Sequence, residues 1–321
     1  MLFRICFLSF ALVLASACSD NDGLTQQADP DFVPRNTVKS FSELNSPIVF
    51  IDEAHNNFHT ANGRYEPFSQ VLMSDGYTVM ASKKALTYAH LKQADILVIA
   101  NALDEGRRDW TPPFLEAFSE QEIQAIKKWV NGGGSLLLIV DHTPFTKASE
   151  SLWRAFGFEF SHGHVANASF KVADGSLAQH AITILAPNVL NQTSYNTFES
   201  SEESEANSSA YFSQIRTFGG SAFRTPQNAV SLLTLGAGTQ SLVPEIPFQI
   251  SSKTPRVSMQ GWSQGAVLEI GEGRVAVFSE AMMFTSQVYV PTGEKMGLVS
   301  KGAEHNEAFL LNVMHWLSKA I

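Results

Sequence analysis

The stretch 129–142, WVNGGGSLLLIVDH in one-letter code, decides the fold class of this chain. It joins the end of an amphipathic helix to three glycines and then to an apolar strand that stops at Asp141 and His142. Upstream, Ser119 and Glu122 have the spacing of an N-terminal capping box. Apolar side chains then follow at helical spacing: Ile123, Ile126, Trp129 and Val130. A helix that turns through glycine into a buried strand predicts a parallel α/β sheet.

Other apolar runs alternate with helical patterns along the chain. Strands are predicted at 47–51, 78–81, 94–100 and 135–140, and helices at 65–74, 119–130, 147–156 and 306–319. A glycine turn within 265–278 predicts a hairpin. We therefore predict an α/β fold, with a mostly parallel central sheet covered on both faces. A loop- and strand-rich insertion is expected around 160–260, where no helical period is visible, and 200–209 is expected to be a solvated loop.

The composition limits both the core and the partners. The chain has 321 residues, 44% of them hydrophobic, so it can bury a large core. A net charge of −9 without a basic cluster argues against nucleic acid as a partner. The letters DEAH at 52–55 match a helicase motif, but the sequence has no glycine-rich phosphate loop, so no ATP binding is expected.

The first residues have the order of a secretory signal. Arg4 supplies a positive charge, residues 5–14 are apolar, and the small residues 15–17 precede Cys18. This arrangement resembles the lipobox of bacterial lipoproteins, with alanine in place of the usual leucine three positions before the cysteine. The resemblance implies cleavage before Cys18, its acylation, and a membrane anchor; Ser19 favours the outer membrane. The alternative is an ordinary signal peptide that leaves Cys18 a free thiol.

The predicted organisation is therefore a signal peptide at 1–17, a lipidated Cys18 with a flexible tether to residue 40, and one domain at 41–321. Cys6 and Cys18 are the two cysteines of the sequence, and Cys6 lies within the signal. The mature domain is thus expected to have no disulfide and no cysteine-based metal site.

Three predicted strands end abruptly in ionisable residues. The candidate site residues are Asp52, Glu53, His55, His59, Asp141, His142 and Glu280. In an open parallel sheet the carboxyl ends of the strands form the ligand-binding edge, so neighbouring strands would bring these side chains into one cleft. The cleft could hold a divalent metal through His55, His59, Asp141 and His142, or could supply a general acid and base without a metal. The plainer interpretation of each segment is that its carboxylate caps a helix or turn.

His162 and His164 form a second pair. On a strand, two histidines at this spacing point the same way and can chelate zinc. With no third ligand evident, a structural role is the preferred interpretation.

The chain also resembles the class I glutamine amidotransferase-like superfamily, especially its ThuA-like and uncharacterised transport-associated branches. The resemblance rests on 129–142 and on two further segments, IVFIDEAHNNFH at 48–59 and GEGRVAVFSEAMMF at 271–284. It implies a flavodoxin-like sandwich with a pocket at the strand ends. Those amidotransferases place a nucleophilic cysteine at the elbow where this chain has Asp141 and His142, so cysteine-dependent glutaminase chemistry is excluded.

Two hypotheses remain open from the sequence. The first is a membrane-anchored hydrolase, metal-assisted in one version, for a carbohydrate or cell-envelope substrate. Asp141, His142, Asp52 and His55 would bind the metal or activate water, with Glu53 or Glu280 as acid or base. The second is a non-catalytic module that holds a sugar or peptide, or that serves an envelope transport complex.

Overall fold

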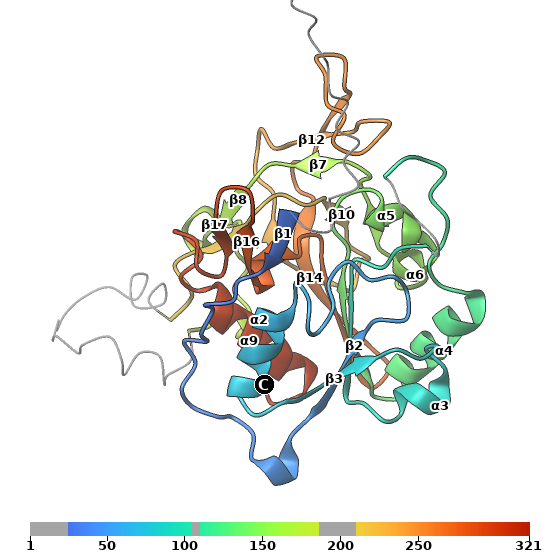
Figure 1. Ribbon diagram of the computed structural model, residues 1–321, viewed down its shortest axis with the longest axis vertical. Helices are drawn as coiled ribbons and strands as arrows, with labels where there is room; N and C mark the ends of the chain where they lie inside the picture. The colour runs from blue at the N-terminus through green and yellow to red at the C-terminus, as the bar shows by residue number, and fades with distance from the viewer. Residues whose placement is uncertain (1–24, 105–109, 186–209) are drawn as a thin grey trace, which may run out of the picture.

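The computed structural model describes residues 25–104, 110–185 and 210–321 (Figure 1). In this part of the chain, nine strands form the central sheet. Eight of them follow one another in the order β3 (Thr78–Ser82), β2 (Ile48–Asp52), β4 (Ile96–Ala100), β5 (Ser135–Ile139), β15 (Gly273–Phe278), β14 (Ser263–Ile270), β10 (Phe223–Arg224) and β6 (Glu159–Phe160). The ninth, β11 (Val230–Thr234), pairs with β14. The first five strands are parallel and the remaining pairings are antiparallel, so the predicted mostly parallel α/β sheet is confirmed.

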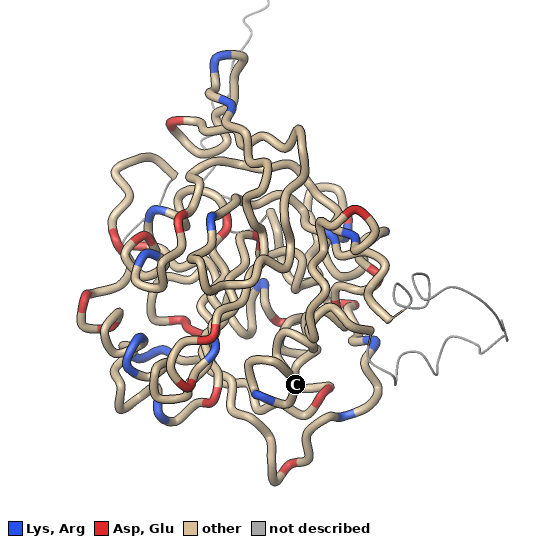
Figure 2. Tube along the Cα trace, turned by 180° about the vertical axis from the view of Figure 1, so that it is seen from behind, with Lys and Arg blue, Asp and Glu red and all other residues tan. Residues whose placement is uncertain are grey.

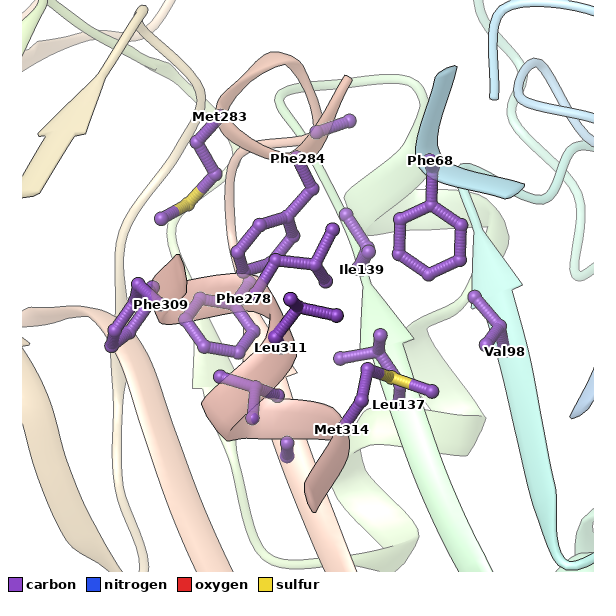
Figure 3. Packing of buried hydrophobic residues seen from close by; sticks show 14 of the residues in the cluster. Phe68, Val98, Leu137, Ile139, Phe278, Met283, Phe284, Phe309, Leu311 and Met314 are labelled. Carbon is purple, nitrogen blue, oxygen red and sulfur yellow. The ribbon is translucent and has the colours of Figure 1, made fainter. Parts of the chain in front are cut away.

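Alternate side chains of the parallel strands enter two separate cores. On one face, Val98 and Leu137 pack in a cluster with Phe68 of α2 (Glu66–Ser74) and Met314 of α9 (Asn306–Leu317), as Figure 3 shows. Three helices cover the other face: α3 (Tyr88–Leu91), α4 (Glu120–Asn131) and α6 (Glu150–Ala155). Because both faces are covered, β4 and β5 are apolar at nearly every position, as the sequence predicted.

The helix–turn–strand connection at 129–142 follows the prediction closely. The Ser119 hydroxyl accepts a hydrogen bond from the Glu122 backbone N–H, and the Glu122 carboxylate accepts one from the Ser119 N–H, which completes the capping box of α4. A side chain at Gly134 would collide with Trp129, since an added β-carbon would lie 2.1 Å from that ring. Glycine therefore lets the helix pack directly on the strand that follows.

The segment after α5 (Phe145–Ala148) and α6 is rich in short strands, as expected for 160–260. Two small sheets lie outside the central one: β13 (Arg256–Ser258) with β12 (Gln240–Leu242) and β7 (His164–Val165), and β8 (Ala168–Phe170) with β9 (Ile215–Thr217). Four 3-10 helices are also described, η1 (Glu43–Asn45), η2 (Val172–Asp174), η3 (Ala181–Thr183) and η4 (Met282–Phe284). The expected loop at 200–209 lies outside the described residues.

The expected extent of the tether is corrected by the structure. Residues from 25 onward belong to the domain, because β1 (Gln26–Ala28) pairs with β16 (Ser286–Tyr289), which in turn pairs with β17 (Glu294–Gly297). The buried Asp29 forms an ion pair with Lys295 at 2.8 Å, and the Phe32 side chain joins the core. The polar composition of this segment concealed these long-range contacts. Cys18 and the signal segment lie outside the described residues, among which no helix is long and apolar enough to span a bilayer.

Candidate functional site

A cavity of about 550 Å³ opens at the carboxyl ends of β4, β5 and β15. Register explains why polar residues converge there. Phe278 of β15 pairs with Ile139 of β5, so Glu280 and Asp141 each follow two positions beyond matched strand ends. On the other side of β5, β4 ends at Ala100 and is followed at once by Asn101, which also lines the cavity. Another cavity, of about 480 Å³, lies at the opposite end of the sheet beside the glycine turn 132–134.

Glu280 is the buried acid of this pocket. Its two oxygens accept backbone N–H groups, Oε1 from Met282 at 2.6 Å and Oε2 from Met283 at 2.8 Å. Burial and the nearby charge of Asp141 nevertheless raise the pKa of Glu280 to about 8. At neutral pH this carboxyl group therefore holds a proton, which it can donate.

His142 is oriented by its own backbone. Its Nδ1 lies 2.8 Å from the Thr143 carbonyl oxygen, which can only accept, so Nδ1 carries the hydrogen and the lone pair is on Nε2. That Nε2 lies 3.9 Å from Asp141 Oδ1. The His142 ring also stacks on His164 at 4.3 Å between centroids. Burial and the His142 charge lower the pKa of His164 to about 3, and its buried Nε2 has no hydrogen-bond partner among the described residues.

Asn101 holds the floor of the pocket in place. Its Oδ1 accepts the Asp141 backbone N–H at 2.8 Å, and its Nδ2 donates to His59 Nδ1 at 3.2 Å. The backbone of Asn101 is left-handed, with φ 54°, a conformation that asparagine tolerates better than most residues. Burial and the charge of Arg64 lower the pKa of His59 to about 3, so this ring is neutral. His59 thus lines the cavity as a fixed, uncharged residue.

Aromatic rings surround the polar floor. Trp110 packs edge-on against Phe145, with centroids 5.4 Å apart, and against Phe248 at 5.8 Å. Phe248 also approaches His142 at 4.9 Å, although its side chain is 58% exposed. Its φ of 64° is strained for a bulky side chain. The pocket therefore combines a charged and hydrogen-bonding floor with an apolar, partly open rim.

Asp52 and His55 form a second cluster, away from this cavity. His55 Nδ1 lies 2.8 Å from Asp52 Oδ2, and its Nε2 lies 3.1 Å from Glu122 Oε1 at the start of α4. Burial alone would lower the pKa of His55, but the hydrogen bond and charge of Asp52, with Glu122, raise it. Glu53 accepts the Ala61 backbone N–H at 2.9 Å.

The single cleft expected from the sequence is therefore divided between two places. The physical reason is the strand order, because β4 lies between β2 and β5 and separates their carboxyl ends. Asp141, His142, Glu280 and His59 line the pocket, whereas Asp52, Glu53 and His55 do not. Among the described residues, no three metal-ligating side chains converge on one point.

Sequence reasoning missed several residues of the pocket. Asn101 carried the same signal as the others, since it follows an apolar strand directly. His164 lines the cavity, but its ring and that of His162 diverge: His162 Nδ1 bonds the Thr146 hydroxyl at 2.9 Å outside the cavity. Trp110 and Phe248 come from loops with no local pattern that could have identified them.

No family model matches the sequence, and no curated protein sequence matches it either. Among solved structures, the chain is similar to the "mmIFT52 N-terminal domain", with a TM-score of 0.51, 12% identity, and 84% of this chain and 97% of that chain covered. A ThuA-like protein from Parabacteroides merdae gives a TM-score of 0.46 at 10% identity, covering 86% and 91%. A GMP synthase protein from Thermoplasma acidophilum gives 0.42 at 8%, covering 86% and 96%. At such identities these likenesses concern the fold alone.

Proposed function

We propose that this protein is a lipid-anchored envelope protein whose pocket binds a carbohydrate and hydrolyses a C–O bond in it. We also assign its sheet to the flavodoxin-like class, because the order β3-β2-β4-β5-β15 corresponds to the arrangement 2-1-3-4-5. The observation that carries the proposal is the pairing of a proton-holding Glu280 with Asp141 in one aromatic-rimmed pocket.

The carbohydrate class follows from the two kinds of surface in the pocket. Sugars present apolar C–H faces and polar hydroxyl edges, so they are bound well where aromatic rings flank hydrogen-bonding groups. Trp110 and Phe248 supply the rings, and Asn101, Asp141 and His142 lie on the polar floor. A cavity of about 550 Å³ is within the usual range for a small ligand.

The proposed chemistry is metal-independent acid–base hydrolysis. The Nε2 of His142 takes a proton from a water molecule, and the resulting hydroxide attacks the carbon of the scissile C–O bond. Glu280 gives its proton to the departing oxygen. Asp141 stabilises the imidazolium formed at His142, across the 3.9 Å that separates them. Transfer of that proton back to Glu280 through solvent restores the starting state.

One observation favours a second candidate, a binding module without turnover. Both oxygens of Glu280 already accept backbone N–H groups, an arrangement that also suits a purely structural acid supporting η4. In this version the same pocket holds a sugar or peptide, and the protein serves an envelope transport complex.

A glycan-binding and hydrolase screen of the purified protein separates the two candidates. Trp110→Ala should abolish binding in both cases, because it removes the central ring of the rim. His142→Gln and Glu280→Gln should abolish product release but keep binding if the protein is an enzyme. Sugar binding without turnover in the wild type would establish the module, and the absence of both would refute the pocket assignment. Asp141→Ala serves as an additional control for the floor.

The anchor is tested separately at Cys18. Acylation predicts cleavage before Cys18 and recovery of the protein with the membrane fraction. The Cys18→Ser variant should remain uncleaved or become soluble. Mass spectrometry of the N-terminal peptide decides the matter, since an unmodified Cys18 in soluble wild-type protein would contradict the anchor.

A further inference from the structure

The beginning of the ordered domain lies at the mouth of the pocket. Thr25 and Gln26 line the cavity together with Tyr289, and Gln26 pairs with Tyr289 across β1 and β16. Six residues, 19–24, separate Thr25 from Cys18. A fully extended chain of this length spans at most about 25 Å. If Cys18 is acylated, as the proposed function holds, the pocket mouth must therefore stay close to the bilayer.

The same end of the molecule exposes apolar side chains. We define the mouth rim as Phe248, Ile250, Tyr289 and Val290. Phe248 and Tyr289 line the cavity, and the Val290 N–H bonds the Thr25 carbonyl oxygen at 2.8 Å. Ile250 is 49% exposed and lies two residues from Phe248, within the hairpin that follows β12. Figure 1 shows this hairpin in orange at the upper end of the molecule, with β1 also in the upper half.

Charge on the hairpin suits a membrane surface as well. Residues 243–256 contain Lys253 and Arg256 against the single acid Glu245, although the whole chain has a net charge of −9. Figure 2 shows blue, basic segments on this hairpin at the top of the molecule. Basic residues beside exposed aromatic and aliphatic side chains are typical of surfaces that rest in the headgroup region of an anionic bilayer.

We propose that the mouth rim docks on the lipid bilayer to which Cys18 tethers the chain, so that the pocket opens toward the membrane. Phe248 and Ile250 then lie at the interface, with Lys253 and Arg256 against anionic headgroups. This inference rests on the proposed anchor at Cys18. It goes beyond that anchor because a tether alone does not choose which face of the domain meets the lipid.

Site-specific quenching tests the orientation in the full-length, lipidated protein. Acylation of Cys18 leaves the mature chain without a free thiol, so Ile250→Cys provides a unique labelling site. The matched control is Leu44→Cys, because Leu44 is 95% exposed on η1, which precedes the amino end of β2 at the opposite end of the sheet. Both variants are labelled with bimane and reconstituted into vesicles of phosphatidylethanolamine, phosphatidylglycerol and a doxyl-labelled lipid.

The label at position 250 should be quenched at least about threefold more than the label at position 44, because interfacial side chains sit within roughly 10 Å of the acyl boundary. Equal quenching in protein whose Cys18 is acylated would overturn the docking surface and leave the anchor intact. An unmodified Cys18, detected by mass spectrometry of the same sample, would overturn both. Thermal unfolding of the two labelled variants verifies that the substitutions preserve the fold.

Discussion

Replacing His55 with alanine should destabilise the domain strongly, although His55 lies outside the pocket. Its ring is held between the fully buried Asp52 and Glu122, at 2.8 and 3.1 Å. It also packs on Phe118, with ring centroids 4.4 Å apart. Without the ring, the Asp52 carboxylate keeps one hydrogen bond among those described, from the Ala54 N–H at 3.2 Å.

The magnitude follows from that uncompensated charge. Removing one partner of a buried ion pair costs about 3–5 kcal/mol of unfolding free energy, mostly because the remaining charge stays desolvated. For a domain of this size, 1 kcal/mol corresponds to roughly 2 °C in melting temperature, so a decrease of about 6–10 °C is expected. Since His55 begins the loop that carries Phe58 and His59 into the pocket, the same change should also weaken ligand binding.

The loss should depend on pH with a defined sign. Because the pKa of His55 is raised in the folded state, the folded protein binds this proton more tightly than the unfolded chain. The stabilisation is fully present below the unfolded pKa of about 6.5 and is lost as the pH rises through the folded value. The difference between wild type and His55→Ala should therefore be larger at about pH 6 than at about pH 9.

Urea unfolding followed by tryptophan fluorescence measures these differences. The double variant Asp52→Asn/His55→Ala should recover part of the lost stability, because asparagine leaves no buried charge. His90→Ala is the matched control: burial lowers the pKa of His90, so its contribution should change with pH in the opposite direction. A loss below about 1 kcal/mol for His55→Ala, or no recovery in the double variant, would refute the reasoning.

Three further predictions concern the pocket itself. Wild-type stability should fall between about pH 4.5 and 8, because folded Glu280, with its pKa raised to about 8, holds a proton that the unfolded chain releases near its ordinary value. Glu280→Gln should flatten this slope in urea titrations, and parallel curves would contradict the assignment. Asn101→Ala should cost about 2–4 kcal/mol through lost hydrogen bonds and a strained φ, and Asn101→Gly about 1 kcal/mol less; equal losses in thermal unfolding would exclude the strain. Gly220→Ala should be far more destabilising than Gly238→Ala, because both have positive φ but only at Gly220 would a β-carbon lie 2.1 Å from the Ser279 carbonyl oxygen; similar melting temperatures would show that the pocket wall yields.

Much of the scaffold was predictable from local patterns. The capping box at Ser119 and Glu122, the glycine turn 132–134 and the apolar run after it all appear where the sequence placed them. The helix expected at 147–156 is divided at Ser149 into α5 and α6. These features depend on backbone hydrogen bonding and periodicity over a few residues, so the sequence alone displays them.

The candidate site was predictable only in part. Asp141, His142 and Glu280 were identified because each follows an apolar strand, and their strands are neighbours. Asp52 carried the same signal but belongs to another cluster. The start of the domain at residue 25 was also hidden, because it depends on pairing between β1 and the distant β16.

By itself the sequence determined the α/β class, the strands and helices of the first 160 residues, and the ionisable character of the strand ends. Tertiary structure alone decided which of those ends meet. Strand order is set by packing between segments far apart in the chain, and it placed β4 between β2 and β5. The same long-range packing brought Trp110 and Phe248 over Asp141, and Glu122 onto His55. No local pattern records such contacts, because their free energy comes from surfaces that come together only when the whole domain folds.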